Sequence, residues 1–254
     1  MKVKDLINYI DTFAPWSLAE EWDNSGLQTG SYEADVKKVG ICLDAVPEAV
    51  IEADEKNCEV LLTHHPLLFR ALKKINVNVE LGRTIKEAIK RDVNIIAAHT
   101  NWDRADEGVN FTLAKLIGLS DIKPLSENFG LIGKLENGLE TKDFLGHVKK
   151  SWNLSRIDFY SAGIGHKISR VAICGGSGAE FWRAAKLHNA DIYLTADMKY
   201  HELADATNAE LSIGLCDHGE MERASLPKLA EKISQSGLET VILDIEALNK
   251  PMRF

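Results

Sequence analysis

Residues 39–66, VGICLDAVPEAVIEADEKNCEVLLTHHP, have a counterpart in residues 171–198, VAICGGSGAEFWRAAKLHNADIYLTADM. Each stretch begins V-x-I-C, continues with a helix-like segment and ends in a short apolar run that closes on Leu-Thr. The two align without a gap at an offset of 132 residues (171 minus 39), which places Thr63 opposite Thr195. This agreement of order, spacing and element type predicts an internal duplication of a strand–helix–strand unit.

Each copy continues with another helical stretch and another strand, LGRTIKEAIKRD with NIIAAHT in the first and MKYHELADATNAE with LSIGLCDHG in the second. Strands that alternate with helices predict an α/β fold with largely parallel or mixed sheets covered by helices on both faces. Between the copies, residues 129–152 predict a strand, a glycine-containing turn and a helix. We therefore expect two similar halves, residues 1–125 with an N-terminal helix and residues 126–254.

The composition restricts the class of protein. The chain has 254 residues, 45% hydrophobic and 27% charged, with a net charge of −8, which argues against nucleic-acid binding through a general basic face. It has no apolar run long enough for a membrane span, and its N-terminus predicts an amphipathic helix rather than a signal peptide. The four widely spaced cysteines predict buried thiols and a cytoplasmic protein.

Four of the eight histidines directly follow apolar strands: His64, His65, His99 and His218. The carboxyl ends of parallel strands are where α/β proteins place their sites. His64 and His65 precede Pro66, so the backbone turns there and each imidazole could reach a different metal ion. The alternative is an ordinary turn in which one histidine is satisfied by hydrogen bonds.

Two further segments offer carboxylates beside histidines. Asp103 follows His99 in a strand-to-helix loop, where His99 could be a ligand, a neighbour of the ligands or a proton carrier. Alternatively, Asp103 only caps local backbone. Glu222 lies four residues after His218 and shares its face if a helix begins there; an ordinary acidic first helical turn is the alternative.

Together these strand ends, which lie on both halves, predict a metal site. The candidate ligands mix imidazole and carboxylate, which suits Zn, Fe(II) or Mn(II). They are His64, His65, Asp103, His218 and Glu222. Five side chains suit two divalent ions per subunit with Glu222 as a bridge, and the resulting positive charge would attract an anionic small molecule.

Other motifs have weaker functional interpretations. The glycine-rich stretch at residues 175–178 could cradle an anion, but its place in the repeat favours a tight turn. Asp197 and His201 could line the site or belong to a polar helix face. Cys42 and Cys174 occupy equivalent repeat positions, which predicts core packing. His147, His166 and His188 lack a strand-end context and are expected at the surface.

The chain resembles the Nif-three-like family, whose members carry the label GTP cyclohydrolase 1 type 2 homologue. Six segments in family order carry the resemblance: AEEWDNSGLQTG (19–30), LLTHHPLLF (61–69), AAHTNWDRADEGVN (97–110), CGGSG (174–178), DIYLTADMKYHE (191–202) and residues 218–222. The resemblance implies a two-domain α/β fold without the inserted middle domain of some members. It also implies a toroidal homohexamer and a dinuclear centre in the cleft between the halves, on the same five ligands, with His99 beside it and Asp23 and Asn24 approaching it. Asp217 stands where the family usually has glycine.

Two functions follow as hypotheses. The first is a metal-dependent hydrolase for a nucleotide or other phosphate-bearing small molecule, with His99 moving a proton. The family label implies opening of the GTP purine ring, although the sequence contains no identifiable guanine pocket. The second is a non-enzymatic metal-binding regulator or assembly scaffold.

Overall fold

The structure is a computed structural model that describes residues 1–127, 129–162, 167–243 and 245. The chain forms two compact units: unit 1 consists of Met1–Asp106 and Leu226–Phe254, and unit 2 consists of Glu107–Ser225. We expected a single boundary after residue 125. The division instead falls after residue 106, and the chain returns to unit 1 after residue 225. α5 (Val109–Leu116) and β5 (Ser120–Pro124) belong to unit 2, whereas α10 (Leu226–Ser234) and β11 (Glu239–Ile242) return to unit 1.

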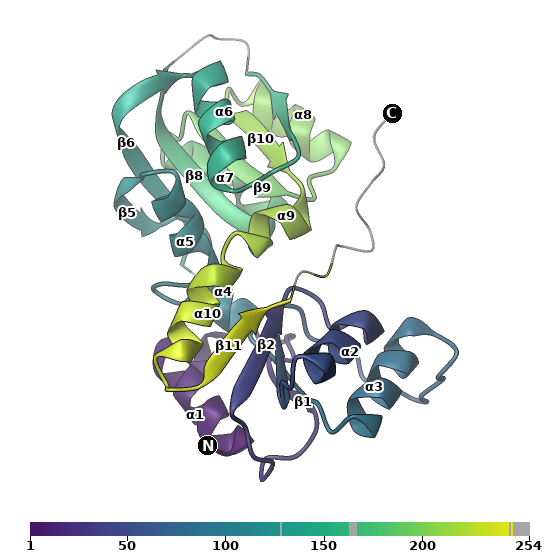
Figure 1. Cartoon of the computed structure of the whole chain (residues 1–254). Coiled ribbons are helices and arrows are strands. Elements are labelled where there is room, and N and C mark those ends of the chain that lie inside the picture. The colour runs from purple at the N-terminus through teal and green to yellow at the C-terminus, as the bar shows by residue number, and fades with distance from the viewer. Residues whose placement is uncertain (128, 163–166, 244, 246–254) are drawn as a thin grey trace. The chain divides into compact units, whose positions relative to one another are not determined.

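Unit 1 is built on a five-stranded sheet with the order β1-β4-β3-β2-β11 (Figure 1). Its other strands are β1 (Gly26–Thr29), β2 (Lys38–Cys42), β3 (Val60–Thr63) and β4 (Asn94–Ala97). β4, β3, β2 and β11 are mutually parallel, and β1 is antiparallel to β4. Every residue of β3 and β4 is buried, as expected for parallel strands covered on both faces.

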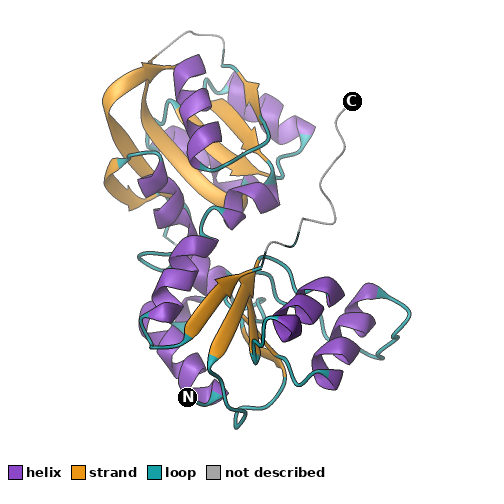
Figure 2. Cartoon of the chain, in the orientation of Figure 1, coloured by secondary structure: helices purple, strands orange, loops and turns teal. Residues whose placement is uncertain are grey.

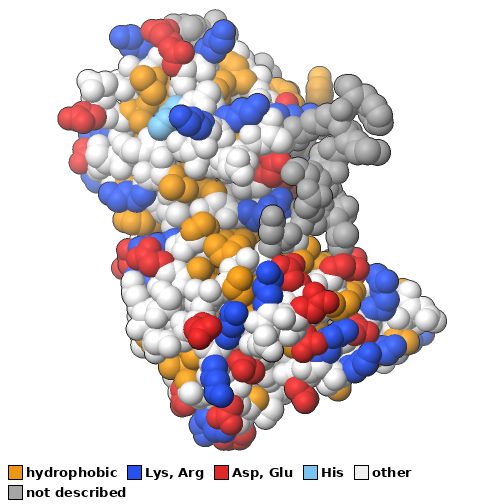
Figure 3. Space-filling model, in the orientation of Figure 1, with side chains coloured by type: hydrophobic (Ala, Val, Ile, Leu, Met, Phe, Trp, Pro, Cys, Tyr) orange, Lys and Arg blue, Asp and Glu red, His pale blue; other side chains and the backbone are white. Residues whose placement is uncertain are grey.

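Helices cover both faces of this sheet (Figure 2). α2 (Pro47–Glu55) and α3 (Glu80–Lys90) pack against each other, and α10 contacts β11 and β2. The predicted N-terminal helix is α1 (Val3–Phe13); its apolar stripe is buried, and the Tyr9 hydroxyl donates to the Lys232 carbonyl of α10 at 3.1 Å. Acidic and basic side chains intermingle over α2 and α3 in Figure 3. Arg91, directly after α3, pairs with Asp54 and Glu87.

Unit 2 is built on a six-stranded sheet with the order β5-β6-β8-β9-β10-β7. Its strands after β5 are β6 (Leu131–Glu140), β7 (Ile157–Tyr160), β8 (Lys167–Ser177), β9 (Ile192–Ala196) and β10 (Ser212–Cys216). β8, β9 and β10 are parallel, and the outer pairings are antiparallel. The expected turn after the strand at Leu131 is absent from the described β6, which continues through an irregularity between Lys134 and Leu139.

The two faces of this sheet carry different helices. α7 (Trp182–Leu187) and α8 (Tyr200–Asn208) contribute Trp182, Leu203 and Ala206 to a core on one face with Tyr193. α5 and α6 (Thr141–Ser151) both contact β6 and β8. The Trp152 indole, just after α6, donates to the Leu113 carbonyl of α5 at 3.0 Å.

The pairing registers agree with the duplication. β2 pairs with β3 through Val39 and Val60, and β8 pairs with β9 through Val171 and Ile192, each partner shifted by the same offset. Cys42 and Cys174, at equivalent positions of the repeat, are buried, and none of the four cysteines forms a disulfide. The predicted α/β class with two related sheets is therefore confirmed.

Candidate metal centre

His64 lies directly after β3, with its side chain fixed by a backbone carbonyl. Its Nδ1 lies 3.0 Å from the carbonyl oxygen of Ala98, which follows β4. This contact turns Nε2 toward Asp103, whose Oδ1 is 3.6 Å away. Asp103 lies on the short helix α4 (Thr100–Arg104), which starts immediately after His99. The structure therefore brings together the two predicted ligands His64 and Asp103.

His65 is oriented by Asp44, a residue that the sequence reasoning missed. Its Nδ1 lies 2.7 Å from Asp44 Oδ1, and Asp44 follows β2 just as His65 follows β3. Asp44 could have been predicted from its position just after a strand, which is the same feature that identified the histidines. The ring centroids of His64 and His65 are 5.1 Å apart, so the adjacent histidines lie together at the turn.

His99 is held by Asp23 at the third strand end of unit 1. Its Nδ1 lies 2.8 Å from Asp23 Oδ1, and the ligand atoms of His64, His65 and His99 all lie within 4.8 Å of one another. Burial opposes ionisation of Asp23, but hydrogen bonds from His99, Thr100 and Ser25 hold its pKa well below the usual range. Asp23 therefore carries a negative charge beside the imidazole cluster.

Unit 2 presents the pair His218 and Glu222 on α9 (His218–Arg223). The helix begins at His218, and His218 Nε2 lies 3.1 Å from Glu222 Oε1, one turn away. His218 Nδ1 lies 2.6 Å from Asp197 Oδ2, directly after β9. Burial disfavours the His218 cation, yet hydrogen bonds and charge from Glu222 and Asp197 outweigh it and raise its pKa to about 9.

Gly176 makes room for this pair. It lies in β8 with a φ of +65°, and a Cβ there would collide with Glu222 Oε1 and lie 3.3 Å from His218 Nε2. The glycine-rich stretch is therefore neither a loop cradle nor a simple turn, because Gly175 and Gly176 are strand residues. Asp217 is the N-cap of α9 and accepts from the Glu220 amide at 3.0 Å.

The four imidazoles share one arrangement. His64, His65, His99 and His218 each have Nδ1 within hydrogen-bond distance of a carbonyl or carboxylate oxygen. Metal-binding histidines characteristically donate the N–H of one ring nitrogen in this way, which fixes the tautomer and directs the other nitrogen toward the ion. Imidazole with carboxylate is also a donor set suited to Zn, Fe(II) or Mn(II). The residues present therefore fit divalent metal binding.

The other predicted candidates divide. Asp197 lies at the site beside His218, although it precedes α8 rather than lying on it. His201 on α8 makes its described ring contact with Tyr200. His147 and His188 are exposed, as expected, and His166 lies outside the described residues. Glu220, on the same helix as Glu222, accepts from the backbone amide and the hydroxyl of Ser155 at 2.7 and 2.8 Å.

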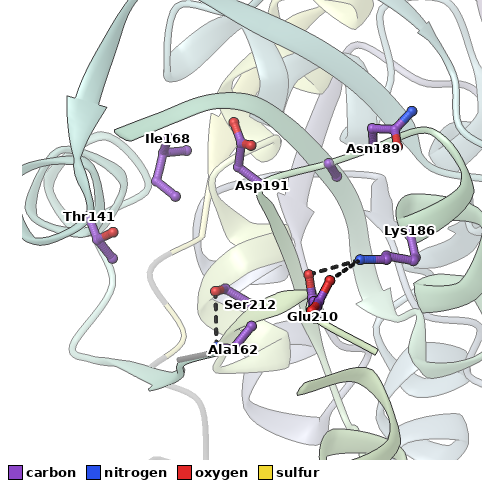
Figure 4. A pocket seen from close by; sticks show the side chains of 9 residues that line it. Thr141, Ala162, Ile168, Lys186, Asn189, Asp191, Glu210 and Ser212 are labelled. Atoms are coloured by element: carbon purple, nitrogen blue, oxygen red, sulfur yellow. Dashed lines mark hydrogen bonds and ion pairs between the residues drawn. The ribbon is translucent and has the colours of Figure 1, made fainter. Parts of the chain in front are cut away.

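A pocket of about 230 Å³ lies in unit 2 at the ends of the strands opposite their carboxyl ends (Figure 4). It is lined at the amino ends of β8, β9 and β10 by Ile168, Asp191 and Ser212, among others. Lys186 supplies its cation, but this ammonium donates to the Glu210 carbonyl at 3.2 Å and lies 3.8 Å from the Glu210 carboxylate. None of the predicted site residues is among its described lining, so we do not assign it the chemistry of the strand ends.

Within the described part of the chain, no helix is long and apolar enough to cross a membrane. Two related α/β sheets with histidines and carboxylates at their strand ends define an α/β protein with a candidate metal centre. Comparison with known sequences identifies its family. The model of the Duf34/NIF3 (NGG1p interacting factor 3) family matches residues 1–250, and the chain belongs to this family.

Relatives and solved structures agree with this assignment. A GTP cyclohydrolase 1 type 2 homolog of Clostridium perfringens is 35% identical, with 92% of each chain covered. Among solved structures, a hypothetical protein of Staphylococcus aureus is 27% identical, has a TM-score of 0.89 and covers 100% of this chain and 99% of its own. Reduced HcgD from Methanocaldococcus jannaschii is 30% identical, with a TM-score of 0.84 and coverage of 96% and 98%.

Proposed function

We propose that this protein binds two divalent metal ions per subunit and uses them to hydrolyse an anionic small molecule, such as a nucleotide. The observation that carries the proposal is the common orientation of the imidazoles, each held through Nδ1. The proposed ligands are His64, His65, Asp103, His218 and Glu222. That the ligands of both units share their ions stays a prediction, which loss of both ions in Glu222→Gln would support.

Bound ions would supply a hydroxide near neutral pH and polarise a substrate oxygen. The side chains of the protein itself have two tasks in this proposal. Asp44 and Asp197 hold the rings of His65 and His218 in position. His99 carries a proton through Nε2, because Asp23 engages its Nδ1.

Metal content per chain, measured by plasma mass spectrometry, tests the metal site. The sample is untagged protein prepared without chelator, beside Glu222→Gln and the matched control Glu220→Gln, two residues away on the same helix. We expect about two ions in the wild type and the control and a clear loss in Glu222→Gln. Near-zero content in the wild type after anaerobic reconstitution with Fe(II), Mn(II) and Zn(II) would refute the site.

Hydrolysis is tested separately with metal-loaded protein and GTP, because relatives carry the name GTP cyclohydrolase 1 type 2 homolog. Chromatography would follow loss of GTP and appearance of ring-opened product, with an authentic cyclohydrolase in parallel. Loss of turnover in His99→Ala with unchanged metal content would support the proton-carrying role. Absence of turnover with GTP and other nucleotides would contradict the hydrolase.

The alternative function is a metal-binding regulator or assembly scaffold. It is favoured by an exposed apolar stretch in unit 1, where Phe69, Leu72, Ile75, Val77 and Val79 all face solvent. A homohexamer stays a prediction of the resemblance, and a cytoplasmic location stays a prediction from the cysteines. Light scattering checks the first, and cell fractionation checks the second. Full metal loading without any hydrolysis would favour this alternative.

A further inference from the structure

Two exposed aromatic side chains stand beside His99 in unit 1. Trp22 is 58% exposed and Phe69 is 50% exposed, although both are large apolar groups. Their ring centroids are 5.7 Å apart and their planes are inclined at 57°. Both rings meet His99 nearly edge-on, with centroid distances of 6.0 Å for Trp22 and 6.3 Å for Phe69. The two rings therefore form an open corner next to the proposed proton carrier.

Polar contacts hold this corner in place. The side-chain amide of Asn24 donates through Nδ2 to the Leu68 carbonyl at 2.7 Å. This bond connects the residue before Phe69 to the segment that carries Trp22. Gln28 closes the connection, since its Oε1 accepts from the Leu68 amide at 3.1 Å and its Nε2 donates to the Asn24 carbonyl at 2.6 Å. The two rings are thus positioned by hydrogen bonds of their neighbours while their faces stay in water. Because this aromatic surface is already formed, little conformational entropy is lost when a ligand binds to it.

The segment that carries Phe69 is also basic. Residues 66–79 contain Arg70, Lys73 and Lys74 and no acidic residue, in a chain with a net charge of −8. All three cations are exposed. An anionic group on a ligand would therefore meet favourable charge beside the aromatic corner.

We propose that Trp22 and Phe69 bind the planar heteroaromatic ring of an anionic ligand by stacking and so determine which molecules are presented to His99. The proposal rests on the function proposed above and assigns its specificity to two residues. Every flat heteroaromatic ring offers a π-face to such a surface, so stacking selects a ring over a sugar phosphate without base-specific hydrogen bonds. Trp22 and Phe69 are binding residues, distinct from the metal ligands.

Calorimetric titration with two probes tests this proposal. GMP carries a purine ring and a phosphate, and ribose 5-phosphate carries the phosphate alone. Both are titrated into metal-loaded and chelator-treated full-length protein. The variants are Trp22→Ala, Phe69→Ala and Trp22→Phe, with Tyr32→Ala as a control because Tyr32 is an equally exposed aromatic residue (55%) of unit 1. We expect the wild type to prefer GMP and Trp22→Ala to weaken GMP binding roughly 5- to 100-fold.

Trp22→Phe should restore most of the affinity, and Tyr32→Ala should leave it unchanged. Equal binding of GMP and ribose 5-phosphate, or equal GMP affinity in wild type and Trp22→Ala, would overturn the proposal. The proposal would also be overturned if the wild type did not bind GMP and Trp22→Ala changed the molecular mass in solution. A second copy of the chain would then cover the corner. Metal content is measured on the same samples, so loss of the metal site is distinguished from loss of ring recognition.

Discussion

Removal of the Asp23 carboxylate should destabilise unit 1 more than any exposed substitution. The side chain is fully buried, and its two oxygens accept from five groups. Oδ1 accepts from His99 Nδ1 at 2.8 Å and from the Asn24 amide at 2.7 Å. Oδ2 accepts from the Ser25 hydroxyl at 2.8 Å and from the amide and hydroxyl of Thr100 at 3.1 and 2.5 Å.

The magnitude follows from these contacts. A hydrogen bond to a charged group contributes about 1.5–3 kcal/mol, but bonds that share one acceptor do not add. Removing one partner of a buried charged network typically costs about 3–5 kcal/mol, because the other groups stay buried without their acceptor. We therefore expect Asp23→Ala to lower the free energy of unfolding by about 3–5 kcal/mol, and Asp23→Asn by less because an amide oxygen still accepts.

Urea unfolding followed by tryptophan fluorescence measures this change, and amide exchange at Thr100 locates it. The exposed Asp35, paired with Lys2, provides a control whose replacement by alanine should have no measurable effect. A loss below about 1 kcal/mol for Asp23→Ala would refute the reasoning, since the contacts would then be worth no more than surface bonds.

Acid should reduce the same difference. Because the folded pKa of Asp23 is depressed, its contribution is present above the unfolded value of about 3.9 and is lost as the pH falls toward the folded value. The difference in stability between wild type and Asp23→Ala should therefore be constant from pH 7 to 5 and shrink below pH 4. A difference that grows on acidification would contradict the sign of the shift.

Three further predictions follow from the same geometry. Asp44→Asn should weaken metal binding about 10- to 100-fold, because His65 loses the carboxylate that orients it, and competition with a chromophoric chelator measures the loss. In metal-free protein the pKa of His218 is raised to about 9, so its protonation stabilises the fold fully below about pH 6.5, and this stabilisation is lost as the pH rises through 9. Metal binding at pH 7.5 should therefore release a proton, which is measured in weak buffer. His218→Ala should release less. Burial, reinforced by Asp217, raises the pKa of Cys216 to about 12, so this thiol should react with a disulfide reagent at pH 8 only after unfolding.

The sequence predicted the elements of the two central sheets well because their signal is local. The run NIIAA becomes β4, and the strand-end positions of His64, His65 and His218 could be read from the residues before them. The place of β11 could not be predicted in this way. Its apolar run fits either sheet, and only its parallel pairing with β2, some two hundred residues earlier in the chain, assigns it to unit 1.

Side-chain partners were the harder part of the site. Asp44 is separated from His65 by a whole helix, so no spacing rule connects them, and an aspartate after a strand is usually explained as a cap or turn. The resemblance led us to expect Asp23 near the site, and the structure places it 2.8 Å from His99 Nδ1, but no spacing rule predicts this contact. Pairings of this kind depend on how parallel strands bring their carboxyl ends together.

The bare Cα at position 176 sets the two copies of the repeat apart. Gly176 aligns with Asp44, so one copy has at this position the carboxylate that orients a histidine, and the other has no side chain. Since a Cβ at 176 collides with the Glu222 carboxylate, a second copy with aspartate at this position could not place Glu222 where it now stands. The two strand ends are therefore not interchangeable: exchanging them would remove the carboxylate beside His65 in one unit and displace Glu222 in the other.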